Sequence, residues 1–371
     1  MKKTLLLKHL LFLTLITTLS SCGTDDNGYI DIPDNTDTID TGNPPLVIDI
    51  NNLPFAKLSD YKFYEGELQD MKPVEGVLPY DLNSSLFTDY SLKKRFIWMP
   101  EGSSATYNGD GELLNFPTGT ILVKNFYYEN VLPNNVKRVI ETRLMIKKAD
   151  EWIFANYVWN DEQNEAILDI NGSYTDISWQ QNGVTKSTSY RIPSAAECFT
   201  CHKSGSTPIP IGTKPQNLNK VYNYTDGSQN QLSKWLQKGY LSGTVPDAIT
   251  STVNWEDTSL PTELRVRSYL DINCAHCHSE GAHCDYMPVR FAFTETASPD
   301  NLGICVPPFE FINNSLTYIV TKGNATRSAL HYRINTNNES ERMPLLGRTV
   351  IHEEGVELIK NWINGMDSPC P

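Results

Sequence analysis

The pattern of apolar and polar residues changes its period near residue 190. Upstream, short runs alternate with a period of two, and one side of the run 138–147 carries Ile140, Thr142, Leu144 and Ile146. Such alternation is typical of β-strands with one buried face. Similar runs cover residues 95–99, 121–128, 152–159 and 174–179, and turn signals such as Asn108-Gly109 and Asn171-Gly172 separate them. Short strands at this spacing predict a β-rich, sandwich-like or open-barrel domain over residues 50–188.

Downstream of residue 190, the period becomes helical and the connecting loops become long. Residues 194–197 have the pattern of a capped helix start, and residues 231–241 form a short amphipathic segment. A further apolar stripe consists of Val266, Tyr269 and Leu270. Near the C-terminus, a helical spacing relates Ile359, Trp362, Ile363 and Met366. The pattern therefore predicts an α+β multidomain chain, in which a β-rich domain precedes mainly α-helical domains.

The first 22 residues have the pattern of a bacterial export signal. Lys2 and Lys3 precede an apolar run that is short for a transmembrane anchor, the alternative interpretation. The run ends in Leu19-Ser20-Ser21-Cys22, which resembles a lipobox, whose cysteine becomes lipidated. Residues 23–49 are acidic and rich in Thr, Asn and Pro, and we expect a disordered tether. These features predict a protein anchored through Cys22 to the bacterial outer membrane, facing the periplasm or the cell surface.

Charge and composition restrict the partners of this chain. The 371 residues carry a formal net charge of −13, which repels nucleic acid and favours partners with a basic docking face. A hydrophobic content of 39% is too low for a protein with many membrane spans. The membrane contact that we expect is therefore the lipid anchor alone.

Two five-residue motifs carry the clearest chemistry. Both have the pattern Cys-x-x-Cys-His, at residues 198–202 and at residues 274–278. In c-type haem proteins, two such thiols add to the vinyl groups of one porphyrin and the adjacent imidazole binds the iron. The motifs predict two covalently bound haem c groups. Their attachment residues and iron ligands would be Cys198, Cys201 and His202 for the first haem, and Cys274, Cys277 and His278 for the second.

Zinc binding and cysteine redox chemistry are the alternatives for these motifs. Zinc ribbons separate their cysteine pairs by about 15–20 residues, whereas Cys201 and Cys274 lie much further apart. A thioredoxin-like pair needs a βαβ context that the pattern lacks. The export signal favours haem, because c-type attachment takes place outside the cytoplasm. Residues 108–112 lack the remaining ligands of a calcium loop and favour a hairpin turn.

The order of elements around the second motif resembles the class I cytochrome c fold. In that fold, a helix leads into the motif, a Met-Pro loop supplies the distal iron ligand, and a last helix closes the domain. Met343-Pro344 occupies the place of that loop, so the resemblance implies Met343 as the sixth ligand of the second haem. Core packing is the alternative role for Met343. We accordingly expect a first haem c segment at 189–245 and a cytochrome c-like domain at 246–371.

Longer stretches resemble a family of exported bacterial dihaem c-type cytochromes that includes lipoproteins. These stretches are residues 80–90, 116–120, 141–144, 157–163, 215–219, 269–278 and 343–348. The resemblance implies two haems and single-electron transfer between redox protein partners, and it implies no substrate. No catalytic residue is assigned. Neither Cys284 nor His331 belongs to the family's pattern, so neither receives a role from it.

The alternative function is a haem enzyme, such as a dihaem peroxidase with an open distal site at the first haem. Between His202 and His276 the sequence has no Met and no other His. We therefore expect the distal ligand of the first haem to come from outside this segment, or the site to be open. The candidates are Met71, Met99, Met145, Met287, Met366, His276, His283, His331 and His352, with Lys214 as a local option.

Four cysteines lie outside the two motifs. Cys22 is assigned to the lipid, which leaves Cys284, Cys305 and Cys370. An oxidising compartment permits a disulfide, and we favour Cys305–Cys370 over the rival pairing Cys284–Cys305. The favoured bond would hold the C-terminal tail beside the second haem domain.

Overall fold

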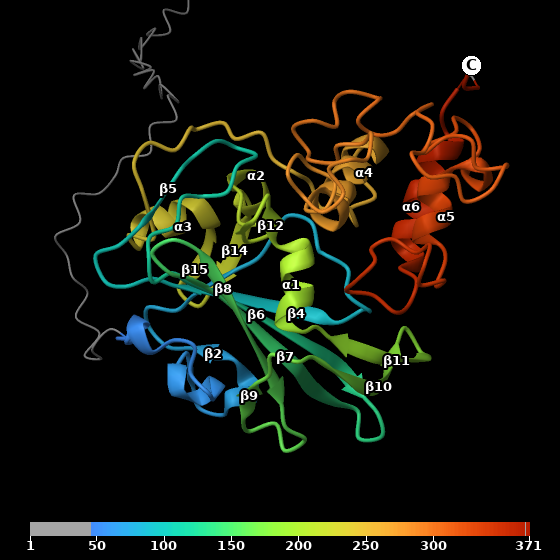
Figure 1. Cartoon of the computed structure of the whole chain (residues 1–371). Coiled ribbons are helices and arrows are strands. Elements are labelled where there is room, and N and C mark those ends of the chain that lie inside the picture. The colour runs from blue at the N-terminus through green and yellow to red at the C-terminus, as the bar shows by residue number, and fades with distance from the viewer. Residues whose placement is uncertain (1–45, 368) are drawn as a thin grey trace, which may run out of the picture.

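The computed structural model in Figure 1 describes residues 46–367 and 369–371. The predicted export signal, the lipobox with Cys22 and the tether up to residue 45 lie outside the described residues. Residues 46–49, the end of the predicted tether, instead pack on the folded chain, and Ile48 is buried. None of the helices within the described ranges is long and apolar enough to cross a membrane.

The N-terminal part of the chain is built on one eight-stranded antiparallel sheet. Its main path has the order β11-β10-β6-β7-β8-β9, and β4 pairs with both β6 and β3. The long central strands are β6 (Ile121–Val131), β7 (Val136–Lys147) and β8 (Trp152–Trp159). The others are β3 (Leu78–Tyr80), β4 (Leu92–Trp98), β9 (Ala166–Leu168), β10 (Ser173–Gln181) and β11 (Val184–Ile192). The alternating runs of the sequence lie on these strands, because alternation places every second side chain on the same face.

Both faces of the central sheet are covered. One face carries Phe96, Val123 and Leu144, and residues 48–77 pack over it with Tyr61 and Phe63. This covering segment contains the short strands and 3-10 helices η1 (Ile50–Asn52), η2 (Leu58–Tyr61), β1 (Tyr64–Glu65), η3 (Leu68–Asp70) and β2 (Lys72–Pro73). The opposite face carries Ile97, Leu122 and Met145, and residues 218–241 pack against it through Trp235. The first predicted haem segment therefore shares its hydrophobic core with the sheet.

Short helices and two-stranded pairs follow the sheet. The helices are α1 (Ala195–Cys201), α2 (Pro215–Leu218), α3 (Gln231–Gln237), α4 (Thr262–Leu270), α5 (Ala329–Ile334) and α6 (Glu353–Asn364), with a π-helix η4 (Asp271–Ala275) and a 3-10 helix η5 (Ala325–Arg327). The short strands are β5 (Ala105–Thr106), β12 (Lys203–Ser204), β13 (Thr207–Pro208), β14 (Val221–Tyr224), β15 (Gly227–Asn230) and β16 (Leu241–Ser242). α4 packs against α6, and their apolar residues, including Val266, Leu270 and Ile359, form a separate core.

The expected fold class is wrong. The chain is mostly β, with 27% strand and 19% helix, and no helical cytochrome-like domain is evident in the described residues. The N-terminal β-rich region is present. The expectation of mainly helical domains over 189–245 and 246–371 fails for a physical reason. Residues 203–230 form strand pairs, and residues 276–324, all of them described, contain no helix, so long loops fill the space that helices would occupy.

Residues 80–90, which link β3 to β4, connect the sheet to the C-terminal half. The backbone N–H of Phe87 donates a hydrogen bond to Asn273 Oδ1 at 2.8 Å. The buried carboxylate of Asp89 accepts hydrogen bonds from the backbone N–H groups of Thr349 and Val350, at 2.6 and 3.0 Å. These bonds fix the second motif and the 349–350 loop against the sheet.

A disulfide holds the C-terminal tail. Cys305 and Cys370 are bonded, with their Cα atoms 5.4 Å apart. Tyr318 Oη also donates a hydrogen bond to the carbonyl oxygen of Pro371 at 2.7 Å. Cys284, the rival partner of Cys305, is a buried free thiol.

Candidate functional site

The first motif lies on α1, which packs over the sheet (Figure 1). A capping box starts this helix: Ser194 Oγ accepts from the backbone N–H of Glu197, and Glu197 Oε2 accepts from the N–H of Ser194. Arg191 of β11 pairs with Glu197 at 2.7 Å and so ties the helix to the sheet. Because an α-helix has 3.6 residues per turn, Cys198 and Cys201 project from nearly the same side of α1.

His202 follows directly after α1. Its Nδ1 lies 3.1 Å from the carbonyl oxygen of Ile209, which can only accept, so Nδ1 carries the proton and Nε2 keeps its lone pair. A hydrogen bond of this kind is the usual support of a metal-binding histidine. The ring packs edge-on against Phe154 of β8. Burial and the nearby Lys124 lower the pKa of His202 to about 3, so the imidazole is neutral, as a metal ligand must be.

The second motif begins in η4, the continuation of α4. The buried carboxylate of Asp271 anchors this segment by accepting hydrogen bonds from the side chains of Gln216 and Asn217 and from the N–H of Phe293. The motif then turns, and the N–H groups of Cys277 and His278 both donate to the carbonyl of Cys274 at 3.0 Å.

His278 is buried beside the ring of Phe291. Its Nδ1 has no hydrogen-bond partner among the described residues. Burial, with His276 as the next cause, lowers the pKa of His278 to about 4. This imidazole is therefore also neutral.

Each motif lines a cavity of its own. The first cavity encloses about 1240 Å³, including space open to solvent, and its lining includes Cys198, Cys201 and His202. The second encloses about 1310 Å³ by the same measure, and its lining includes Cys274, Cys277 and His278. The two cavities share a wall formed by Cys201, Asn273, His276, Pro344 and Leu346. All six predicted attachment residues and proximal ligands thus line cavities, and the cavities adjoin.

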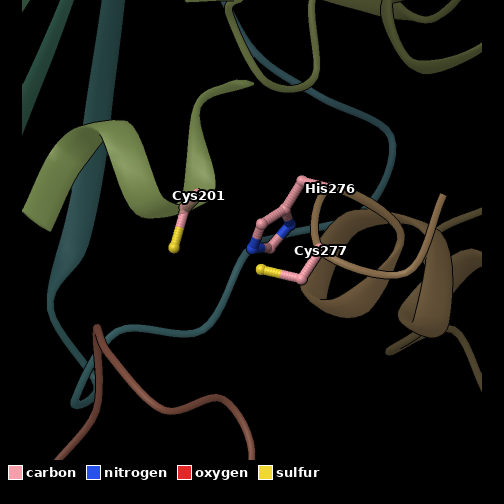
Figure 2. Close-up of side chains that lie close together, drawn as sticks. All are labelled: Cys201, His276 and Cys277. Atoms are coloured by element: carbon pink, nitrogen blue, oxygen red, sulfur yellow. The ribbon is translucent and has the colours of Figure 1, made fainter. Parts of the chain in front are cut away.

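Side chains of the two motifs meet at this shared wall, as Figure 2 shows. The potential ligand atoms of Cys201, His276 and Cys277 all lie within 4.8 Å of one another. The hydrogen bond with Cys277 lowers the pKa of the Cys201 thiol, whereas burial raises the pKa of Cys198 to about 11 and that of Cys274 to about 12. Of these three thiols, Cys201 ionises at the lowest pH.

Met343 and Pro344 line the second cavity. The loop is held by Arg348, which is almost fully buried and donates to the carbonyl oxygens of Met343, Arg333 and Thr336 at 2.8–3.1 Å. The N–H of Met343 donates in turn to the carbonyl of Arg333 at 2.9 Å. Sequence analysis gave Arg348 no role. Its place at the end of the 343–348 stretch was the signal that pointed to it.

The structure separates the ten candidate distal ligands of the first haem. Met145 of β7 and His276 line the first cavity. His283 and Met287 line the second cavity instead. The other candidates line neither cavity: they are Met71, Met99, Lys214, His331, His352 and Met366.

The residues present fit covalently attached haem. The four motif cysteines are free thiols, each lies on a cavity wall, and each pair is next to a neutral histidine on the same wall. Much of the remaining lining is apolar, including Leu122 and Ile211 in the first cavity and Val289 and Ile319 in the second. Such a lining suits a large, flat, apolar ring with polar groups at one edge.

Comparisons with protein-family models, with curated proteins and with solved structures found no match to this chain. The functional argument therefore rests on the residues and their geometry.

Proposed function

We propose that this chain is a dihaem c-type cytochrome that passes single electrons between redox partners outside the cytoplasm. The observation that carries the proposal is that each Cys-x-x-Cys-His motif lines its own cavity. Bound haem c supplies one-electron iron chemistry. The first haem would be held by Cys198, Cys201 and His202. The second would be held by Cys274, Cys277 and His278, with Met343 as its distal ligand.

The shared wall supports a relay between the two haems. Cys201 of the first motif and Cys277 of the second are hydrogen-bonded to each other, so the two attachment points adjoin. Methionine–histidine ligation of the second iron would close it to substrates and raise its potential, as electron transfer requires. Adjacent haems and a closed second iron together favour electron transfer over catalysis.

The expected location and partners belong to the same proposal. The resemblance to exported bacterial dihaem cytochromes and the lipobox at Cys22 place the chain at the outer membrane, and its charge of −13 favours basic redox partners. Fractionation of cells that express Cys22→Ala tests the anchor. Release of this variant from the membrane fraction is expected, and a wild-type distribution would contradict the lipobox assignment.

Mass spectrometry of protein made in a host that attaches haem c tests the cofactor. The wild type should carry two haem units that survive denaturation. Replacing both cysteines by serine in one motif should remove one unit, and the paired replacement in the other motif should remove the other. A protein with no covalent porphyrin at either motif would overturn the proposal.

Zinc binding is a second candidate, favoured by one observation. The ligand atoms of Cys201, His276 and Cys277 lie close enough together to bind one ion, and thiolate and imidazole are the ligands of structural zinc sites. The two functions exclude each other, because thiols bonded to haem are thioethers. Elemental analysis decides between them: about one zinc per chain with no haem would favour this second candidate.

A further inference from the structure

Three basic side chains lie next to one another across the sheet. Arg95 of β4 is directly opposite Lys124 of β6, and Lys124 is directly opposite Arg143 of β7. Like charges in directly opposed positions destabilise a sheet. Arg95 is buried and the other two are partly buried, so water cannot fully screen the repulsion. Negative charge is needed to stabilise this row.

The two arginines have such partners within the protein. Arg95 pairs with Asp81 at 2.6 Å. Arg143 pairs with the fully buried Glu141 through two hydrogen bonds. Each arginine charge at the ends of the row is therefore offset by a carboxylate.

Lys124, in the middle of the row, has no hydrogen bond and no ion pair with any described residue. Its one polar contact is with the ring of Phe126, whose centroid lies 5.0 Å from Nζ. One end nitrogen of Arg95, Nη2, is also buried without a hydrogen-bond partner. The row thus contains two donors that the described protein does not satisfy, and such donors are costly to bury.

The row faces the first cavity. Lys124 and Arg143 both line it, together with Cys198, Cys201 and His202. Two further charged residues line it, Arg191 and Glu197, and these two neutralise each other as an ion pair. The cavity wall therefore carries an uncompensated positive charge at Lys124.

We propose that Lys124, flanked by Arg143, binds the carboxylate side chains of the haem held by the first motif; this inference rests on the proposed function. Haem carries two propionate groups at one edge, and burying them requires cations. A charge-assisted hydrogen bond from Nζ would satisfy both the ammonium and a carboxylate. A free inorganic anion has the same chemistry, and the experiment below separates it from haem.

The test compares three variants of the haem-loaded protein. Lys124→Gln removes the charge and Lys124→Arg keeps it. Lys94→Gln is the matched control, because Lys94 precedes Arg95 on the same strand and points to the opposite face of the sheet. We would measure the haem content by mass, the reduction potential of each haem, and the propionate bending bands in the resonance Raman spectrum.

We expect Lys124→Gln to shift the propionate bands and lower the potential of one haem, because less positive charge near the iron favours the oxidised state. Lys124→Arg and Lys94→Gln should resemble the wild type. If Lys124→Gln fails to retain the first haem while Lys124→Arg retains it, the need for a charge is also supported.

Four results would overturn the inference. An unchanged Lys124→Gln spectrum with both haems attached would refute it and leave the proposed function intact. A change in iron spin state would identify Lys124 as an iron ligand. A shift of the wild-type potential on adding inorganic phosphate, lost in Lys124→Gln, would assign the site to a diffusible anion. Wild-type protein without covalent haem would refute the proposed function as well.

Discussion

The ring of Phe87 stacks on the imidazole of His352, with centroids 4.0 Å apart and planes inclined by 11°. His352 precedes α6, and its Nδ1 lies 3.0 Å from Tyr269 Oη on α4. The imidazole thus joins the 80–90 segment to both helices of the C-terminal core. This contact explains why His352, a candidate iron ligand by sequence, faces neither cavity.

Replacing His352 by Gln should make the protein less sensitive to acid. Burial, then Lys93 and Lys186, lowers its pKa to about 3; Glu354, 3.7 Å away, is half-exposed and opposes this weakly. In the unfolded chain the pKa is about 6.5, so below pH 6.5 the unfolded state binds the extra proton and stability falls until about pH 3. Between pH 7 and 5, this costs the wild type about 2 kcal/mol. Urea unfolding at both pH values should show a smaller loss in His352→Gln, and the exposed His283→Gln should keep the wild-type loss.

Asp89→Ala should destabilise the protein by about 2–3 kcal/mol, because it leaves the buried N–H groups of Thr349 and Val350 without their acceptor. Asp161→Ala is the control: Asp161 is exposed and pairs with Arg138 on the surface, so its loss should cost less than about 1 kcal/mol. Urea unfolding at pH 7 gives both values. Equal effects of the two variants would show that the 80–90 segment does not stabilise the C-terminal half.

Met343→Ala should remove the sulfur-to-iron charge-transfer band of the oxidised protein and lower the potential of one haem. Methionine ligation raises the potential of a haem relative to weaker ligands, and Met343 lines the second cavity. Met287→Ala is the matched control, because Met287 lines the same cavity. An unchanged spectrum in Met343→Ala, or the same loss in Met287→Ala, would assign Met343 to core packing.

Arg348→Lys should weaken the same band without removing Met343. A lysine ammonium cannot reproduce the planar donor set with which Arg348 holds the carbonyls of Met343, Arg333 and Thr336. We expect a loss of about 2–3 kcal/mol in unfolding free energy and a band that fades at lower temperature than in the wild type. A wild-type band in this variant would mean that the loop keeps its shape without the guanidinium.

The reduced wild-type protein should not bind carbon monoxide rapidly at either haem. Met145 and His276 line the first cavity, and we expect one of them to reach the first iron. Alanine variants of each, tested by the change in the reduced spectrum on adding carbon monoxide, should show which one protects the iron. Rapid binding by the wild type at one haem would favour the haem-enzyme alternative.

Local patterns in the sequence predicted local structure well. The alternation over residues 138–147 lies within β7, the capping pattern at Ser194 starts α1, and the last apolar stripe lies on α6. These features depend on neighbours a few residues apart, which a sequence displays directly. The fold class was wrong because an order of helix, motif and Met-Pro loop does not determine how much of the intervening chain is helical.

The site was only partly visible for a related reason. The two motifs could be read from the sequence, but the contact between Cys201 and Cys277 depends on tertiary packing. The row of Arg95, Lys124 and Arg143 depends on strand register, since a shift by one residue would turn each side chain to the other face. Neither relationship has a signal in the linear spacing of residues.

The wall between the two cavities has a consequence for how the protein is made. Its motif cysteines are partly buried, and Cys201 and Cys277 are in contact across it. In a chain that carries haem at both motifs, the porphyrins must therefore be attached before this wall closes, while the polypeptide is still open. Biosynthesis then has a fixed order, in which export comes first, loading second and folding last. The cofactors become part of the interior around which the chain folds.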